Sequence, residues 1–159
     1  TGPVYLERQL AIPPDETAGV LHDRLSVLSG EVAVATLDTM TSTVPTPQDH
    51  NQATWAAKIS KADGFVDFGR SATDIDRQIR AYSPWPGGWT HWKDQILKLK
   101  TARPVKGDGV PGTILSIDPL IIACGIGAIE LERVQAPGRK AVSGRDFANG
   151  ARLVLGESL

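Results

Sequence analysis

The sequence predicts a mainly β fold with helices, in which a small β-barrel follows one strand and one long helix. Two features support this prediction. Residues 54–159 contain five short runs typical of strands, separated by turns rich in glycine and proline, and such runs favour a small barrel. Residues 1–40 instead contain one extended run and then an apolar stripe at helical spacing, which predicts a strand and an amphipathic helix.

The first 40 residues carry the predicted strand and long helix. Residues 4–12 are typical of a strand, which Pro13 and Pro14 end because proline lacks the amide hydrogen that a ladder needs. Acidic side chains at 15 and 16 suit a helix N-terminus, and an apolar stripe extends the helix to about Met40. The stripe consists of Ala18, Leu21, Leu25, Leu28 and Val32. Two prolines and many polar residues then predict a linker at 41–53.

The predicted elements after residue 53 are short. In chain order they are a helix at 60–63, an extended segment at 65–68, a helix at 72–82, strands at 89–92, 95–101, 110–117, 120–124 and 128–134, and a helix at 145–152. In the strand at 95–101, Leu97 and Leu99 fall on one face, and Lys98 and Lys100 fall on the other. The Gly-Ile-Gly run at 125–127 opens no helix, so it predicts a hairpin turn rather than a dinucleotide loop.

The helix at 72–82 meets the corner Ser83-Pro84-Trp85-Pro86. Proline removes an amide hydrogen and restricts the residue before it, so the helix ends at or before Ser83. We expect Trp85 to be buried in the core, because a large indole helps to fill a small barrel. Trp89 and Trp92 fall on opposite faces of their strand, and either a core role or stacking on a nucleic-acid base is open to them.

Composition excludes several classes of protein. Of the 159 residues, 41% are hydrophobic and 22% are charged, which is typical of a globular protein, and no apolar run approaches the roughly 20 residues of a membrane span. Cys124 is the only cysteine and lies in an apolar run, so we expect a buried structural thiol rather than a nucleophile. The spacing of the acidic side chains predicts no metal site. We therefore expect neither a membrane nor a metal as partner.

The proline corner resembles a motif of a known family. The run Arg80-Ala81-x-x-Pro84-Trp85-Pro86-Gly87 is similar to the signature of the C-terminal domain of methionyl-tRNA formyltransferases and their formyltransferase relatives. Further runs resemble the same family in the same order. They are Thr1-Gly2-Pro3-Val4-Tyr5, Pro13-Pro14-Asp15-Glu16-Thr17-Ala18-Gly19, Lys58-Ile59-Ser60-Lys61-Ala62-Asp63-Gly64, Pro111-Gly112-Thr113-Ile114, Gln135-x-Pro137-Gly138-Arg139-Lys140-Ala141 and Asp146-Phe147-x-Asn149-Gly150.

The resemblance implies an OB-like β-barrel C-terminal domain that binds tRNA at 54–159, a linker at 41–53, and the C-terminal end of an α/β formyltransferase domain at 1–40. The implied enzyme transfers a formyl group from 10-formyltetrahydrofolate to the amino group of methionyl initiator tRNA. The family's Asn, His and Asp triad has no counterpart here, because no histidine stands in a His-x-Ser-Leu-Leu-Pro segment and the family's Asp precedes the Thr-Gly-Pro run that opens the chain. We expect a C-terminal fragment with no catalytic residue, no bound cofactor and no activity alone. We also expect it to be monomeric and cytoplasmic.

Basic residues concentrate in the second part of the chain. Residues 1–53 carry a net charge of −5 and residues 54–159 a net charge of +4, against −1 for the whole chain, and such asymmetry suggests a polyanion partner. Basic side chains beside a barrel groove can contact phosphates. The candidate tRNA-binding residues are Lys58, Lys61, Arg80, Lys98, Lys100, Arg103, Lys106, Arg139 and Lys140. Alternatively, the strand lysines protect an exposed face, and Arg80 is a structural ion-pair partner.

Two other functions fit parts of the sequence. A formyltransferase that acts on an amino-sugar nucleotide shares the Pro-Trp-Pro corner, and a non-catalytic RNA-binding barrel needs no transferase domain. The runs at 135–140 and 146–150 favour the tRNA enzyme over the amino-sugar enzyme. Binding of initiator tRNA at two salt concentrations separates these two, because phosphate contacts weaken with salt.

Overall fold

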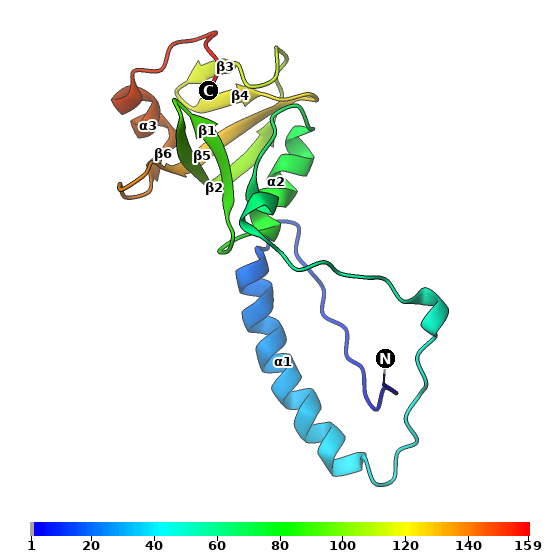
Figure 1. The fold of residues 1–159 in the computed structure, drawn as a ribbon. Coiled ribbons are helices and arrows are strands. Elements are labelled where there is room, and N and C mark those ends of the chain that lie inside the picture. Colours follow the sequence, from blue (N-terminus) through cyan, green and yellow to red (C-terminus); the bar gives the residue numbers. More distant parts are fainter. Residues whose placement is uncertain (1) are drawn as a thin grey trace. The chain divides into compact units, whose positions relative to one another are not determined.

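The computed structural model describes residues 2–159 and contains two compact units. The first unit ends at Lys58, and the second comprises Ile59–Leu159. The first unit contains one long helix, and the second contains a sheet and two further α-helices (Figure 1).

The long helix of the first unit, α1, extends over Ala18–Thr39, as the apolar stripe predicts. Thr17 caps it, because its hydroxyl oxygen accepts a hydrogen bond from the Val20 amide at 3.4 Å. Arg24 forms an ion pair with Glu16 at 2.5 Å and donates to a main-chain carbonyl oxygen of the preceding extended segment at 3.2 Å. These contacts hold the extended segment against the first half of α1. No residue of α1 is buried.

The prediction of a strand at residues 4–12 is wrong. Val4 and Thr46 form one antiparallel bridge through hydrogen bonds of 2.9 and 2.8 Å, and the following residues up to Pro13 have no strand pairing. A strand needs a neighbour to satisfy its amide and carbonyl groups. Among the described residues of this unit, only Thr46 supplies such a partner, so an extended sequence pattern alone forms no strand here.

The second unit begins with a short 3-10 helix, η2 (Lys61–Gly64), followed by the helix α2 (Ala72–Ala81). Both lie close to their predicted positions. The Ser71 hydroxyl caps α2 by accepting a hydrogen bond from an amide of its first turn at 3.1 Å. Ile75 and Ile79 are four residues apart and therefore share one face of the helix, and both are buried. The helix ends before the proline corner, as predicted.

Six strands form one antiparallel sheet in the second unit. Their order is β1-β2-β5-β4-β3, and β6 pairs with β5. Their bounds are β1 (Gly88–Trp92), β2 (Gln95–Val105), β3 (Ile114–Ile117), β4 (Leu120–Ala123), β5 (Ala128–Gln135) and β6 (Val142–Ser143). The last helix, α3, covers Gly144–Ala151, and α2 and α3 lie at different ends of the sheet (Figure 1). The mainly β fold with helices is confirmed.

β1 and β2 form the predicted hairpin. Lys93 and Asp94 make its two-residue turn with φ values of 46° and 58°, and both are left-handed values, as in a type I′ turn. Leu97 and Leu99 of β2 are 0% and 1% exposed, whereas Lys98 is exposed on the other face. The predicted division of β2 into a core face and a basic face is therefore confirmed.

One hydrophobic core lies between the sheet and the helices of the second unit. Its largest fully buried side chains are Val66, Ile75, Ile79, Leu97, Leu99, Ile114, Leu120, Ile122, Ile129, Leu131 and Val134. Cys124 belongs to this core and is 3% exposed, as predicted. Burial disfavours the charged thiolate and raises the pKa of Cys124 to about 11.

Two strand boundaries differ from the prediction by more than one residue, and one strand was not predicted. β3 begins at Ile114 rather than at residue 110, because the preceding residues form a turn in which Gly112 has a φ of 87°. β2 continues beyond the predicted end at residue 101 to Val105. β6 was not predicted, because two residues are too few to show an alternating pattern.

Candidate nucleic-acid interface

Three side chains form a row across the exposed face of β1, β2 and β5. Trp89 is the register partner of Lys98, and Lys98 is also the register partner of Gln135. Residues directly opposite each other in an antiparallel ladder project from the same face. The residues that flank Lys98 along β2 are buried on the other face. We call Trp89, Lys98 and Gln135 the Lys98 row.

The turn between β5 and β6 adjoins one end of the Lys98 row. The Gln135 side-chain amide donates to the carbonyl oxygen of Arg139 at 2.9 Å. The Arg139 amide donates to the Ala136 carbonyl oxygen at 3.1 Å, and Gly138 has a φ of 66°, which glycine adopts without strain. These contacts fix the turn beside Gln135, with Arg139 and Lys140 exposed.

The β2–β5 ladder places another arginine, Arg133, on the same face, two residues before Gln135. The β2–β5 ladder is irregular between Leu99 and Thr101, and Thr101 then pairs with Arg133. Lys100 is the extra residue of this bulge, and Lys100, Thr101 and Arg133 are all exposed. The Arg133 guanidinium donates to the Ala141 carbonyl oxygen at 3.3 Å. Sequence reasoning missed Arg133, because a second irregularity, between Thr101 and Ala102, leaves Glu132 without a register partner and interrupts the alternation along β5.

Arg103 lies further along this ladder, but carboxylates balance its charge. Its guanidinium is 2.7 Å from the Glu130 carboxylate and 3.6 Å from that of Glu132. The Glu130 side chain is only 12% exposed, so water screens this pair less than a fully exposed pair. A cation held by two carboxylates contributes less positive potential at the surface than an unpaired lysine.

Arg80 and Lys106 lie away from the Lys98 row, and Lys58 belongs to the first unit. Arg80 forms an ion pair with Asp76, four residues earlier on α2, at 2.9 Å. The same helix packs Ile79 into the core, on the face of the sheet opposite to Lys98. Lys58 is exposed at the end of the first unit, and Lys106 is exposed beyond the end of β2.

An open groove with aromatic and aliphatic walls includes part of the Lys98 row. Its lining consists of Lys61, Trp85, Pro86, Trp89, Ile96 and Lys98. The Trp89 indole donates to the main-chain carbonyl oxygen of Lys61 at 2.9 Å, which holds two sides of the groove together. Within residues 2–159, neither Lys61 nor Lys98 forms an ion pair with a carboxylate.

The prediction that Trp85 is buried in the core is wrong, because its side chain is 58% exposed. The Gly87 amide donates to the Tyr82 carbonyl oxygen at 2.8 Å and closes the turn after α2. The nearby core is already filled, since a Cβ on Gly88 would lie 2.9 Å from Ile79 Cγ1. A close-packed interior has no room for a further indole, so Trp85 stays on the surface.

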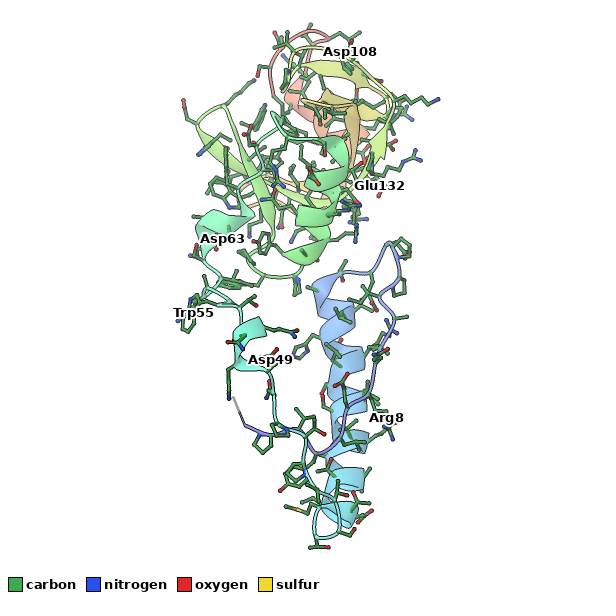
Figure 2. All side chains as sticks on the ribbon, turned by 90° about the vertical axis from the view of Figure 1, so that its right-hand side faces the viewer. Arg8, Asp49, Trp55, Asp63, Asp108 and Glu132 are labelled. Atoms are coloured by element: carbon green, nitrogen blue, oxygen red, sulfur yellow. The ribbon has the colours of Figure 1, made fainter. Side chains whose placement is uncertain are left out.

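The other tryptophans lie in three different environments. Trp89 packs against Phe65 on the outer face, with ring centroids 5.1 Å apart. Trp92 contacts Phe147 of α3 at 4.9 Å and packs against the core, so the predicted opposite orientations are confirmed. Trp55, labelled in Figure 2, belongs to the first unit and is 93% exposed.

The acidic residue of η2 forms a cap. The Ser60 amide and hydroxyl donate to one Asp63 carboxylate oxygen at 2.6 and 2.9 Å; Asp63 is labelled in Figure 2. These hydrogen bonds, the main-chain one foremost, favour the charged carboxylate and lower the pKa of Asp63. Its negative charge is therefore retained at neutral pH while it caps the turn that carries Lys61.

Across residues 2–159, the His, Cys, Asp and Glu side chains do not form a group of three or more that could hold a metal ion. In the same part of the chain, no helix combines the length and the apolar character needed to cross a bilayer. The candidate site therefore consists of cations, aromatic rings and one groove.

Solved structures define the class of fold. One variant of HypX from Aquifex aeolicus matches 92% of this chain with a TM-score of 0.67 and 19% identity, over 28% of its own length. A second variant of HypX matches 99% of this chain with a TM-score of 0.70 and 18% identity, over 29% of its own length. At identities this low, the similarity shows only that the folds are alike. The matching part of HypX is one segment of a longer chain.

Sequence comparison defines the family. Residues 58–152 match the family described as the formyl transferase C-terminal domain. The chain is 43% identical to the methionyl-tRNA formyltransferase of Roseobacter denitrificans over 96% of its length, and 45% identical to that of Ruegeria pomeroyi over 100% of its length. It spans about half of these relatives, 50% and 52% respectively. The chain belongs to the formyl transferase C-terminal domain family, as the Pro-Trp-Pro motif predicts.

Proposed function

We propose that this chain is the tRNA-binding part of an enzyme that transfers a formyl group from 10-formyltetrahydrofolate to the amino group of methionyl initiator tRNA. The observation that carries the proposal is 45% identity over the whole chain to a methionyl-tRNA formyltransferase. A structure of HypX, which shares the fold, is a complex with tetrahydrofolic acid, and this supports a folate as formyl donor.

In the proposed enzyme, this chain binds and orients tRNA while the reaction takes place on residues outside it. We assign 54–159 to the OB-like tRNA-binding domain, 41–53 to a linker and 1–40 to the end of the formyltransferase domain. We assign it no catalytic residue and no bound cofactor, because the Asn, His and Asp triad implied by the family resemblance has no counterpart in the sequence. We expect a monomer in the cytoplasm, where initiator tRNA is used.

The exposed face of β1, β2 and β5 provides the proposed phosphate contacts. Lys98 and Lys100 lie on this face, and the turn with Arg139 and Lys140 lies beside it. Lysines without a carboxylate partner can neutralise phosphates and release counterions, which drives binding to nucleic acid. Arg103 and Arg80 contribute less in this proposal, because carboxylates already hold them.

Salt-dependent binding of labelled initiator tRNA, followed by fluorescence anisotropy, tests this proposal. The logarithm of the binding constant should fall linearly with the logarithm of the salt concentration, with a slope of about 0.9 per phosphate contact. The double variant Lys98→Gln, Lys100→Gln should lower the slope by up to about 1.8. Arg103→Gln should lower it less than Lys98→Gln alone.

Arg145→Gln is the matched control. It removes the same charge from an exposed position on α3, where Arg145 is 3.4 Å from Asp118, and it should leave tRNA binding nearly unchanged. An equal loss in this control would show that overall charge, rather than the proposed face, drives binding. No complex at any salt concentration would overturn the tRNA assignment and favour the amino-sugar enzyme. Formylation above background by this chain alone would contradict the absence of catalytic residues.

A further inference from the structure

We propose that the groove next to Lys98 holds an unpaired base of the bound RNA, stacked on the exposed indole of Trp85. This inference rests on the proposed function, because it takes RNA as the ligand. The groove combines the aromatic and aliphatic surfaces of Trp85, Trp89 and Ile96 with two lysines at its edge. A nucleotide has the matching chemistry, since its base has flat apolar faces and its phosphate is an anion.

Trp85 offers an exposed ring on a restrained main chain. Pro84 and Pro86 restrict the backbone on both sides of it, and the Gly87 amide donates to the Tyr82 carbonyl oxygen at 2.8 Å. The Trp85 side chain is 58% exposed, and within residues 2–159 it stacks on no other ring. A ligand that covers this indole removes apolar surface from water at little cost in backbone ordering.

Trp89 supplies a fixed wall beside that ring. Its indole nitrogen bonds to the Lys61 carbonyl oxygen at 2.9 Å, and its ring packs against Phe65 and His91 with centroids 5.1 and 5.4 Å away. These contacts use its polar atom and hold its orientation. Trp89 therefore shapes the groove, while Trp85 presents the free stacking surface.

The two lysines favour a nucleotide over an apolar protein segment as the occupant. Lys61 and Lys98 form no ion pair within the described residues. An apolar segment seated here would cover the edge of the groove without neutralising either ammonium group. An unpaired nucleotide places a phosphate next to each base, and RNA loops and ends supply such bases.

Two probes of equal charge test the inference on the 159-residue chain. One is a short single-stranded adenosine oligonucleotide, and the other is an abasic oligonucleotide with the same number of phosphates. Base stacking on one aromatic side chain predicts roughly 5- to 100-fold tighter binding of the adenosine probe. Trp85→Ala should remove most of this difference, and Trp85→Phe should keep much of it, because Phe retains a ring face.

Two further variants complete the experiment. Trp55→Ala removes another highly exposed tryptophan, 93% exposed in the first unit, and should leave the preference for bases intact. Lys98→Gln should weaken both probes by the same factor and lower the salt slope by about 0.7. Circular dichroism should show an unchanged fold in Trp85→Ala, because Trp85 lies outside the core.

The possible results separate the groove from the proposed function. Equal affinity of the unaltered chain for both probes, no binding of either probe at low salt, or a preference that survives Trp85→Ala would overturn the stacking groove. Salt-dependent binding of initiator tRNA would then still support the proposed function, and a protein segment would become the better occupant. A base preference lost in Trp85→Ala, in a chain that does not retain initiator tRNA, would support the groove and overturn the tRNA assignment.

Discussion

The Trp89 indole donates a hydrogen bond to the main-chain carbonyl oxygen of Lys61, with 2.9 Å between Nε1 and O. The bond joins η2 to β1, and the Val66 amide reinforces this connection by donating to the Trp89 carbonyl oxygen at 2.8 Å. Two segments distant in the sequence are thereby held together at the groove. The bond also fixes the point on the main chain from which the Lys61 side chain extends.

Replacing Trp89 by Phe should loosen this connection. Trp89→Phe keeps a ring beside Phe65 but removes the indole N–H, so we expect the free energy of unfolding to fall by about 0.5–1.5 kcal/mol. Urea denaturation measures this loss, and hydrogen exchange should show weaker protection of the η2 amides. Trp55→Phe, at an almost fully exposed position, should change neither quantity. An unaltered unfolding free energy in Trp89→Phe would show that the bond does not stabilise the domain.

Gly125 should not tolerate a side chain. Its amide donates to the carbonyl oxygens of Phe68 and Arg70 at 2.9 and 3.0 Å, and a Cβ here would overlap the Gly69 carbonyl oxygen. Gly125→Ala must therefore shift the main chain, and we expect a loss of about 1–3 kcal/mol in thermal or chemical denaturation.

Gly150 provides the contrast to Gly125. It lies in α3, and a Cβ there would meet nothing within 4 Å. Gly150→Ala should stabilise the protein by up to about 1 kcal/mol, because alanine favours a helix over glycine. Equal effects of the two substitutions would contradict the close approach at Gly125.

Cys124 should resist alkylation while the protein is folded. Burial raises its pKa to about 11, so the folded thiol forms less thiolate near neutral pH than an ordinary cysteine with a pKa of about 8.5. Iodoacetamide, followed by mass spectrometry, should modify the chain slowly in buffer and rapidly in urea. Rapid modification of the folded protein would show that the thiol is accessible.

The same burial predicts a pH effect on stability. The unfolded thiol ionises near the ordinary cysteine pKa of about 8.5, whereas burial raises the pKa of the folded Cys124 thiol to about 11. The folded state binds more protons in this window, so the free energy of unfolding should fall as the pH rises through it. Cys124→Ala should remove this part of the pH dependence, and an unchanged profile would contradict the assignment.

The cap at Asp63 should contribute stability only while its carboxylate is charged. Hydrogen bonds from Ser60 lower the pKa of Asp63, so their contribution is fully present above the ordinary carboxyl pKa and is lost as the pH falls through the lowered value. Carbon-detected NMR can follow the titration of this carboxylate. Ser60→Ala removes the hydroxyl donor but keeps the amide, and it should raise the midpoint partway. An unmoved midpoint would show that the hydroxyl has no influence.

Local patterns predicted much of the second unit. The spacing of Ile75 and Ile79 predicts the buried face of α2, and the prolines after Ser83 predict where the helix ends. Alternation along β2 predicts that Leu99 is buried and Lys98 exposed. These predictions succeed because helix and strand periodicities act within a few residues of the chain.

The features that the sequence analysis predicted wrongly or did not predict are determined by contacts with residues distant in the chain. The run at 4–12 forms no strand, because among the described residues only Val4 has a bridge partner. Trp85 is exposed, because Ile79 and its neighbours already fill the core below the proline corner. Arg133 lies on the basic face beside an irregularity of the β2–β5 register, which alternation within β5 does not reveal.

Local pattern and motif thus sufficed to place Lys98 on the polar side of its strand, to end α2 at the prolines and to predict the family. Only the tertiary structure shows that Lys98 pairs with Trp89 and Gln135 in one row, and that Trp85 is exposed to solvent. The physical reason is that strand register and core filling are set by contacts between residues far apart in the chain.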